Sequence, residues 1–122
     1  LQDFTFFKGN LTPDQVVENL FSSYLLILPS KNEGFGVVLL EAMASGLPCI
    51  ASKTGGIVEI INSNIGCLFD VDNTDQLTEC IENLIRDEEK YQQLSSNCQL
   101  YVREYYDWEK IVPRMIDVFN NL

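Results

Sequence analysis

Three short apolar runs limit what this chain can fold into. The segment YLLIL at 24–28 is apolar throughout, which predicts a strand covered on both faces. PCIAS at 48–52 and GCLFD at 66–70 are expected to be two further strands. Because helical patterns separate these runs, the sequence predicts an α/β domain of the doubly wound type, with a Rossmann-like parallel sheet and helices on both faces.

The helix signals begin near the amino end. Thr12 is expected to be an N-cap, with Pro13 in the first turn and Gln15 three residues after the cap. Ahead of this helix, FTFF at 4–7 predicts a short strand that Gly9 ends. The later helices are expected over 35–45, 57–62, 74–86, 88–104 and 108–120.

Length and charge narrow the classes of function. The 122 residues form at most one domain. Eighteen acidic and eight basic residues give a net charge of −10, which argues against a nucleic-acid-binding surface and a polybasic membrane anchor. No apolar run approaches the roughly 20 residues of a membrane-spanning helix. We expect no nucleic-acid partner, no membrane insertion by this segment and a cytoplasmic location.

The cysteines indicate no metal site. Cys49, Cys67, Cys80 and Cys98 form no CxxC pair, and the chain has no histidine, so a zinc site is not expected. We expect reduced thiols, as in a cytosolic protein. Most of these cysteines are expected to be small core residues.

The segment PSKNEGFG at 29–36 is where a ligand site is expected. It leaves the carboxyl end of the 24–28 strand, and open α/β sheets bind ligands at that end. Gly34 and Gly36 flank Phe35 at a helix start, where N–H groups without helical partners favour phosphate. The other interpretation is that the glycines only permit a tight strand-to-helix turn.

Glu41 stands alone in the helix expected over 35–45. Its neighbours are apolar or small, so this helix is expected to be buried all round. A buried carboxylate is strongly unfavourable without a partner. One candidate partner is a ligand diol such as ribose, because one carboxylate can accept hydrogen bonds from both hydroxyls. The other candidate is a neighbouring lysine or backbone N–H. Glu33, eight residues earlier, is either a second ligand group or a solvated loop acid.

Together these motifs resemble a known family. LPSKNEGFGVVLLEAMASGLPCIASKTGGIVEII closely resembles the donor-binding half of the retaining glycosyltransferases of family 4, the glycosyl transferases group 1, which have the GT-B fold. The matching positions are Pro29-Ser30, the Glu33 and Glu41 pair, EGFG, EAMASGLP, and the Gly-Gly-x-x-Glu run from Gly55 to Glu59. A weaker similarity covers the rest of the chain, up to the aromatic segment YYDWEKIV.

The resemblance implies that residues 1–122 are one donor-nucleotide-sugar-binding domain fragment, part of the C-terminal domain of a GT-B enzyme. It implies that the N-terminal acceptor domain and the start of the C-terminal domain are absent. It also implies roles for individual residues. The donor sugar is assigned to Glu33, Gly34, Phe35 and Gly36; the diphosphate to Gly36 and Val37; the ribose to Glu41; and the base to Lys8, Gly9 and Asn10. No residue is assigned as a catalytic acid or base, and neither a metal nor another cofactor is expected.

The implied reaction transfers a hexosyl group from a nucleoside diphosphate sugar to an acceptor hydroxyl with retention of configuration. The acceptor, a sugar or a lipid, is expected to bind through the N-terminal domain, which would also provide any attachment to a membrane. This segment alone is expected to be inactive, because one wall of the cleft is absent. The alternative is a non-catalytic nucleotide-sugar-binding or interaction module of the same fold, and a reading frame extending far upstream favours the enzyme.

The end of the chain carries an apolar stripe. In the family that the chain resembles, the last helix crosses back to the other domain. Part of the stripe is therefore expected to be exposed or to contact another chain. Its members are Tyr105, Trp108, Ile111, Met115, Ile116 and Phe119.

Overall fold

Three short strands pair side by side in the order in which they occur in the sequence. In the computed structural model, which describes residues 2–121, β1 (Leu26–Leu28), β2 (Cys49–Ser52) and β3 (Gly66–Phe69) form a parallel sheet. Ile50 of β2 lies opposite Ile27 on one side and opposite Cys67 of β3 on the other. The three strands expected from the apolar runs are confirmed, with somewhat shorter bounds.

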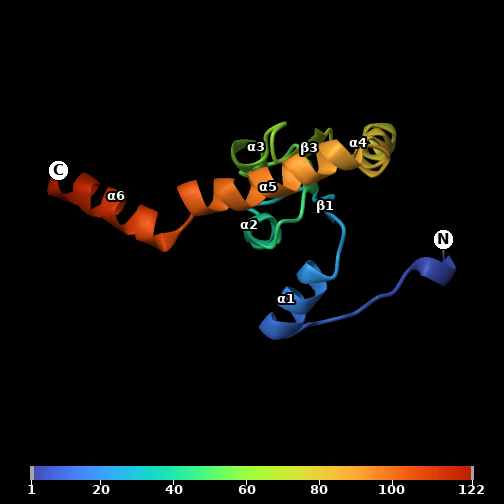
Figure 1. Ribbon diagram of the computed structural model, residues 1–122, viewed down its shortest axis with the longest axis horizontal. Coiled ribbons are helices and arrows are strands. Elements are labelled where there is room, and N and C mark those ends of the chain that lie inside the picture. Colours follow the sequence, from blue (N-terminus) through green and yellow to red (C-terminus); the bar gives the residue numbers. More distant parts are fainter. Residues whose placement is uncertain (1, 122) are drawn as a thin grey trace.

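Helices lie before, between and after these strands (Figure 1). They are η1 (Gln2–Phe4), a 3-10 helix, and the α-helices α1 (Pro13–Phe21), α2 (Val37–Ala44), α3 (Ile57–Ile60), α4 (Thr74–Arg86), α5 (Glu88–Tyr105) and α6 (Trp108–Asn120). The expected cap of α1 is confirmed as a reciprocal pair: the Thr12 N–H donates to Gln15 Oε1 at 2.9 Å, and the Gln15 N–H donates to Thr12 Oγ1 at 3.4 Å. The helices expected after residue 35 are confirmed as well.

Both faces of the sheet are covered, because successive strand residues point to opposite sides. On one face Cys49 and Ala51 pack against α2, α3 and α5. On the other face Ile50 and Phe69 pack against Cys80 and Leu84 of α4 and against Leu94 of α5. The α/β class with helices on both faces is therefore confirmed.

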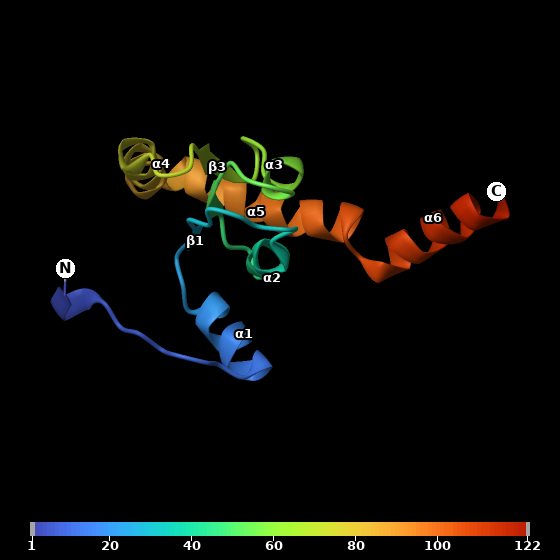
Figure 2. The same cartoon turned by 180° about the vertical axis from the view of Figure 1, so that it is seen from behind.

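The strand expected at 4–7 is not formed. Residues 2–4 form η1, and residues 5–9 are irregular. Phe4, Phe6 and Phe7 are exposed, Phe7 to 96%, and this segment runs apart from the sheet (Figure 2). The physical reason is that a strand needs a neighbour for its backbone hydrogen bonds, and no strand within residues 2–121 pairs with it.

The expectation of reduced thiols is wrong for one pair. Cys67 of β3 and Cys80 of α4 form a disulfide. Cys49 and Cys98 are free and buried, as expected of small core residues, and burial raises the pKa of both thiols. This pairing could not be predicted from the cysteine spacing, because the two cysteines meet only once α4 packs on the sheet.

The last helix carries its apolar residues into solvent. None of its side chains is buried, and α6 extends away from the sheet at one end of the molecule (Figure 1). Trp108, Met115, Ile116 and Phe119 are all exposed, as is Tyr105 at the end of α5. The expectation of an exposed apolar stripe is confirmed.

The disulfide is expected to stabilise the fold. Closing a loop with a sequence separation of 13 residues restricts the unfolded chain and is expected to contribute about 3 kcal/mol. Dithiothreitol should therefore lower the melting temperature measured by circular dichroism. A Cys67→Ser/Cys80→Ser double variant is the control, and it should melt at the same temperature with and without the reductant. An unchanged melting temperature for the reduced parent protein would contradict the contribution.

Candidate functional site

The candidate site lies at the carboxyl ends of β1 and β2. The loop of residues 30–36, here called the site loop, connects β1 to α2. Two hydroxyl groups hold its first part: Ser52 Oγ donates to the Ser30 carbonyl at 2.5 Å, and Thr54 Oγ1 donates to the Lys31 carbonyl at 3.2 Å. Ser52 is only 1% exposed. Its satisfied, buried hydroxyl fixes where the site loop leaves the sheet.

The second part of the site loop lies directly on the turn before α3. The Gly56 N–H donates to the Gly34 carbonyl at 2.9 Å. A Cβ atom on Gly55 would lie 1.7 Å from the Glu33 carbonyl oxygen, and Gly55 has a φ of +49°. Both the close approach and the left-handed backbone require glycine at this position.

The start of α2 presents N–H groups that no protein group accepts. Gly36 is the N-cap residue, with a φ of 79°, a conformation that glycine adopts without strain. Within residues 2–121, the N–H groups of Phe35, Gly36 and Val37 donate no hydrogen bond. Gly34 differs, because its N–H donates to Glu33 Oε1 at 3.1 Å. Free N–H groups at a helix start attract anions.

Glu33 shapes the site loop that contains it. One carboxylate oxygen accepts from the Gly34 N–H, and the other accepts from Ser30 Oγ at 3.4 Å. The residue is half-buried. A carboxylate has about four acceptor positions, so both oxygens keep capacity to accept from a further group.

The helix that carries Glu41 is not buried all round, so that expectation is wrong. Leu39, Ala42 and Met43 are fully buried, whereas Val37 and Glu41 are exposed. These two lie four residues apart, on one side of the helix. That side faces α1 and solvent, whereas the sheet and α5 cover the opposite side. Glu41 is therefore solvated, and within the described chain no group donates a hydrogen bond to its carboxylate.

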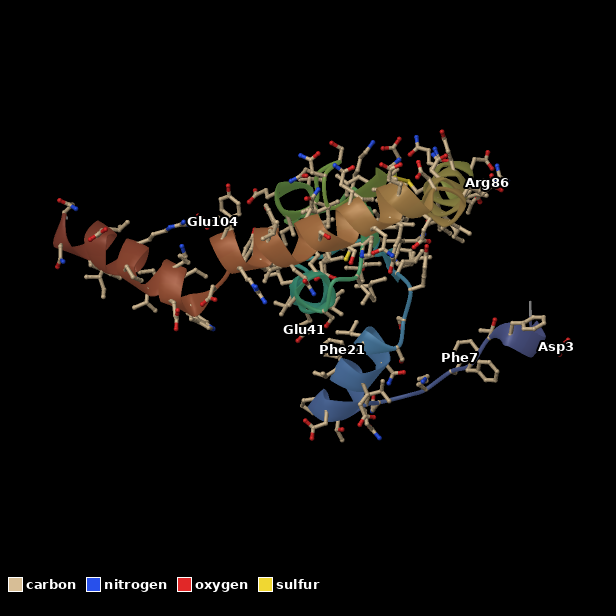
Figure 3. The ribbon with its side chains drawn as sticks, viewed as in Figure 1. Asp3, Phe7, Phe21, Glu41, Arg86 and Glu104 are labelled. Atoms are coloured by element: carbon tan, nitrogen blue, oxygen red, sulfur yellow. A yellow bond between two sulfur atoms is a disulfide. The ribbon has the colours of Figure 1, made fainter. Side chains whose placement is uncertain are left out.

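A groove of about 550 Å³ lies between α1 and α2 and includes Glu41. Figure 3 shows Glu41 on the side of α2 that faces Phe21 of α1. The walls are apolar apart from Glu41 and Ser45, and Leu11 and Val17 are among them. The groove therefore joins a single carboxylate to a mostly apolar surface, which suits a ligand with a polar and a flat apolar part.

Lys8, Gly9 and Asn10 lie outside the site loop. The Lys8 ammonium donates to Asn19 Oδ1 of α1 at 2.5 Å. None of the three lines the groove, although Leu11, the next residue, does. The structure therefore places this segment next to a groove residue but not in the groove wall.

Lys31 of the site loop and Lys53, next to Thr54, are both paired with acids. Lys31 contacts Asp72 at 3.0 Å, and Lys53 contacts Asp70 at 2.8 Å. The hydrogen bond from Lys53 lowers the pKa of Asp70, and a second one from Gln76 adds to the effect. Both lysines are directed towards the segment after β3. The positive potential at the start of α2 therefore comes from backbone dipoles.

The described residues contain neither a cluster of metal ligands nor a membrane-spanning helix. Within residues 2–121, no three His, Cys, Asp or Glu side chains gather as metal ligands would. In the same part of the chain, no helix has the length and apolar character needed to cross a membrane.

Comparison with known proteins identifies the family. The family profile described as "Glycosyl transferases group 1" matches residues 1–100. The chain belongs to this family. N-acetyl-alpha-D-glucosaminyl L-malate synthase of Bacillus anthracis is 37% identical to it over 120 residues, which cover 98% of the chain and 31% of that enzyme. The chain thus spans about a third of the length of the curated relatives it matches.

Solved structures of glycosyltransferases have the same architecture. Sucrose-phosphate synthase from Thermosynechococcus elongatus superimposes with a TM-score of 0.86 and 28% identity, covering 98% of this chain and 30% of that one. HepE of Anabaena, solved in complex with UDP-glucose, superimposes with a TM-score of 0.78 and 26% identity, covering 88% and 30%. These neighbours are GT-B glycosyltransferases, which confirms the fold class of this group 1 chain.

Tyr106 lies near the site of this group 1 glycosyltransferase chain, although the sequence predicted no role for it. Tyr106 packs edge-on against Phe35 of the site loop, with 6.1 Å between ring centroids. Burial raises the pKa of Tyr106 to about 12, with smaller effects from Tyr101 and Glu59. The only sequence signal was the aromatic segment YYDWEKIV, because nothing in the spacing indicates contact with a loop so distant in sequence.

The packing of the site loop predicts a difference between two glycine substitutions. Gly55→Ala places a Cβ 1.7 Å from the Glu33 carbonyl oxygen and should lower the free energy of unfolding by about 2 kcal/mol or more. Gly34→Ala is the control, because its Cβ meets nothing within 4 Å, and it should cost less than about 1 kcal/mol. Urea denaturation measures both. Equal losses would mean that the site loop does not rest on this turn.

Proposed function

We propose that this chain is the donor-binding part of a retaining hexosyltransferase, which transfers a hexosyl group from a nucleoside diphosphate sugar to an acceptor hydroxyl. One observation carries the proposal. The free N–H groups of Phe35, Gly36 and Val37 lie between two carboxylates, Glu33 before them and Glu41 after them. The family membership and the UDP-glucose bound to HepE support the same ligand class.

The spacing along α2 fits the order of groups in a nucleotide. From Val37 to Glu41 the helix rises about 6 Å. A diphosphate on the N–H groups at the start of α2 would place the ribose near Glu41, whose carboxylate accepts from both of its hydroxyls. The apolar groove between α1 and α2 continues from Glu41 towards Leu11. We assign the base to this groove, with Lys8, Gly9 and Asn10 beside its far end.

The sugar lies at the other end of the donor in this proposal. Glu33 accepts from its hydroxyls, and Phe35 and Gly36 contribute N–H groups, while Gly34 contributes a backbone without a side chain. Negative charge develops on the diphosphate as it departs. The helix dipole and the N–H groups of Gly36 and Val37 stabilise that charge without rearrangement. Orientation of the sugar towards the acceptor hydroxyl lowers the reaction barrier further.

The remaining parts of the enzyme are proposed to lie outside this chain. The chain spans about a third of its curated relatives, and its two nearby lysines are paired with Asp70 and Asp72. We therefore propose that basic groups and the acceptor site, for a sugar or a lipid, come from preceding residues, and that this segment alone is inactive. The exposed apolar side of α6 supports contact with such a part.

Substitution of Glu41 should separate binding from stability. Glu41→Ala removes an acceptor of charged hydrogen bonds and is expected to weaken binding of the matching nucleotide by about ten- to a hundredfold. Because Glu41 is exposed, the free energy of unfolding should change by less than about 0.5 kcal/mol.

Ligand-detected NMR of the full-length protein with UDP-, GDP- and ADP-sugars identifies the donor, and calorimetry gives the affinities. Glu79→Ala, at an exposed position within α4, is the control and should bind as the parent protein does. Binding of no nucleotide sugar by the parent protein, or unchanged affinity of Glu41→Ala, would refute the proposed site.

Turnover by the full-length protein is expected to survive removal of divalent metals. The proposed site neutralises the diphosphate with N–H groups and basic residues rather than with a metal ion. A rate in excess EDTA within about twofold of the untreated rate is expected, and an enzyme with a structural or catalytic metal would lose activity. Loss of activity that Mg²⁺ or Mn²⁺ restores would contradict this part of the proposal.

A further inference from the structure

The Gly56 N–H holds the site loop at the Gly34 carbonyl, and the free N–H groups lie just beyond this contact. Phe35 lies between Gly34 and Gly36, and glycines leave the flanking backbone with wide conformational freedom. Phe35 is the only large apolar side chain of the site loop. The position of its ring therefore contributes to the direction in which the N–H groups on either side of it point.

The Phe35 ring lies near the turn before α3 and near the residue that follows α5. A Cβ atom on Gly56 would come within 3.5 Å of Phe35 Cδ2 and 3.3 Å of Phe35 Cα. The Tyr106 ring is 6.1 Å from the Phe35 ring between centroids, at an interplanar angle of 61°. Gly56 can adapt to a displaced ring, since it has no side chain. The aromatic contact with Tyr106 is therefore the one that can restrain the Phe35 ring.

Tyr106 is itself held firmly. Its N–H donates to the Val102 carbonyl at 2.8 Å, which continues the end of α5. Its ring packs on Tyr101, with 5.7 Å between centroids, and the residue is half-buried. Because the Tyr106 ring is held at the end of α5, its contact with Phe35 limits movement of the site loop.

We propose that Tyr106 is a positioning residue for the nucleotide-sugar donor. Its ring holds Phe35, and through Phe35 it fixes the N–H groups that meet the diphosphate. This inference rests on the proposed function, because it concerns the same site. It adds a contribution from the end of α5, an element far from the site loop in sequence.

The test is a set of UDP titrations by calorimetry on the full-length protein, or of GDP or ADP if the donor screen identifies one of these. Edge-on aromatic pairs stabilise by an amount equivalent to about three- to tenfold in an equilibrium constant. Tyr106→Ala should therefore weaken nucleotide binding by about three- to tenfold. Tyr106→Phe keeps the ring and should bind within about twofold of the parent protein. Tyr105→Ala is the matched control, because Tyr105 packs on Tyr101 and lies next to Tyr106 in sequence.

A double-substitution cycle separates positioning from a general structural effect. If Tyr106 acts through Phe35, then Phe35→Ala and Phe35→Ala/Tyr106→Ala should bind the nucleotide equally. Unchanged affinity of Tyr106→Ala, or an equal further loss in the Phe35→Ala background, would overturn the inference. If Tyr106→Ala does not fold, Tyr106→Leu takes its place with the same expectations.

The unliganded protein provides a readout that does not depend on the proposed function. In ¹⁵N-labelled protein, Tyr106→Ala should shift or broaden the amide signals of Phe35 and Gly36, whereas Tyr105→Ala should leave them in place. Unchanged signals in Tyr106→Ala would overturn the inference even if no nucleotide binds. Failure of the parent protein to bind UDP, GDP or ADP, with the amide shifts as expected, would refute the proposed function alone.

Discussion

The geometry of the site depends on one backbone contact. The site loop lies directly against the turn at Gly55 and Gly56. Since neither glycine carries a side chain, the two chain segments approach closely enough for the Gly56 N–H to reach the Gly34 carbonyl at 2.9 Å. This contact sets the direction in which the site loop enters α2. Gly36 takes the left-handed conformation, and within residues 2–121 the N–H groups of Phe35, Gly36 and Val37 donate to no protein acceptor. Larger side chains at Gly55 would separate the two segments, and the start of α2 would lose its orientation.

Charge in this region is arranged so that the backbone supplies the positive potential. The chain has a net charge of −10, and Lys31 and Lys53 are paired with acids that follow β3. An anionic ligand would therefore be held by N–H groups and the helix dipole, which are short-ranged and directional. Such N–H groups would contribute more to selectivity for the shape of a diphosphate than to binding affinity. The high affinity of a complete enzyme would need further basic groups, which agrees with a chain that spans about a third of its relatives.

Local signals in the sequence predicted the elements well, and contacts between distant segments were the main source of error. The helix caps and the strand-to-helix turn depend on nearby residues, so they could be predicted from the sequence. Exposure of Glu41 depends on how α1 covers α2, and apolar composition alone does not encode that. The strand expected at 4–7 failed because strand formation requires a neighbouring strand. The Cys67–Cys80 disulfide and the contact of Tyr106 with Phe35 both join segments that meet only in the folded chain.

A crystal structure of the full-length protein with UDP, or with whichever nucleotide it binds, would show whether the start of α2 holds the diphosphate. Phosphate oxygens are expected about 2.7–3.2 Å from the backbone nitrogens of Phe35, Gly36 or Val37. Both ribose hydroxyls are expected to donate to the Glu41 carboxylate, and the base is expected in the groove between α1 and α2. A diphosphate bound elsewhere, with these three N–H groups donating to protein acceptors and sealed from solvent, would contradict the proposed site.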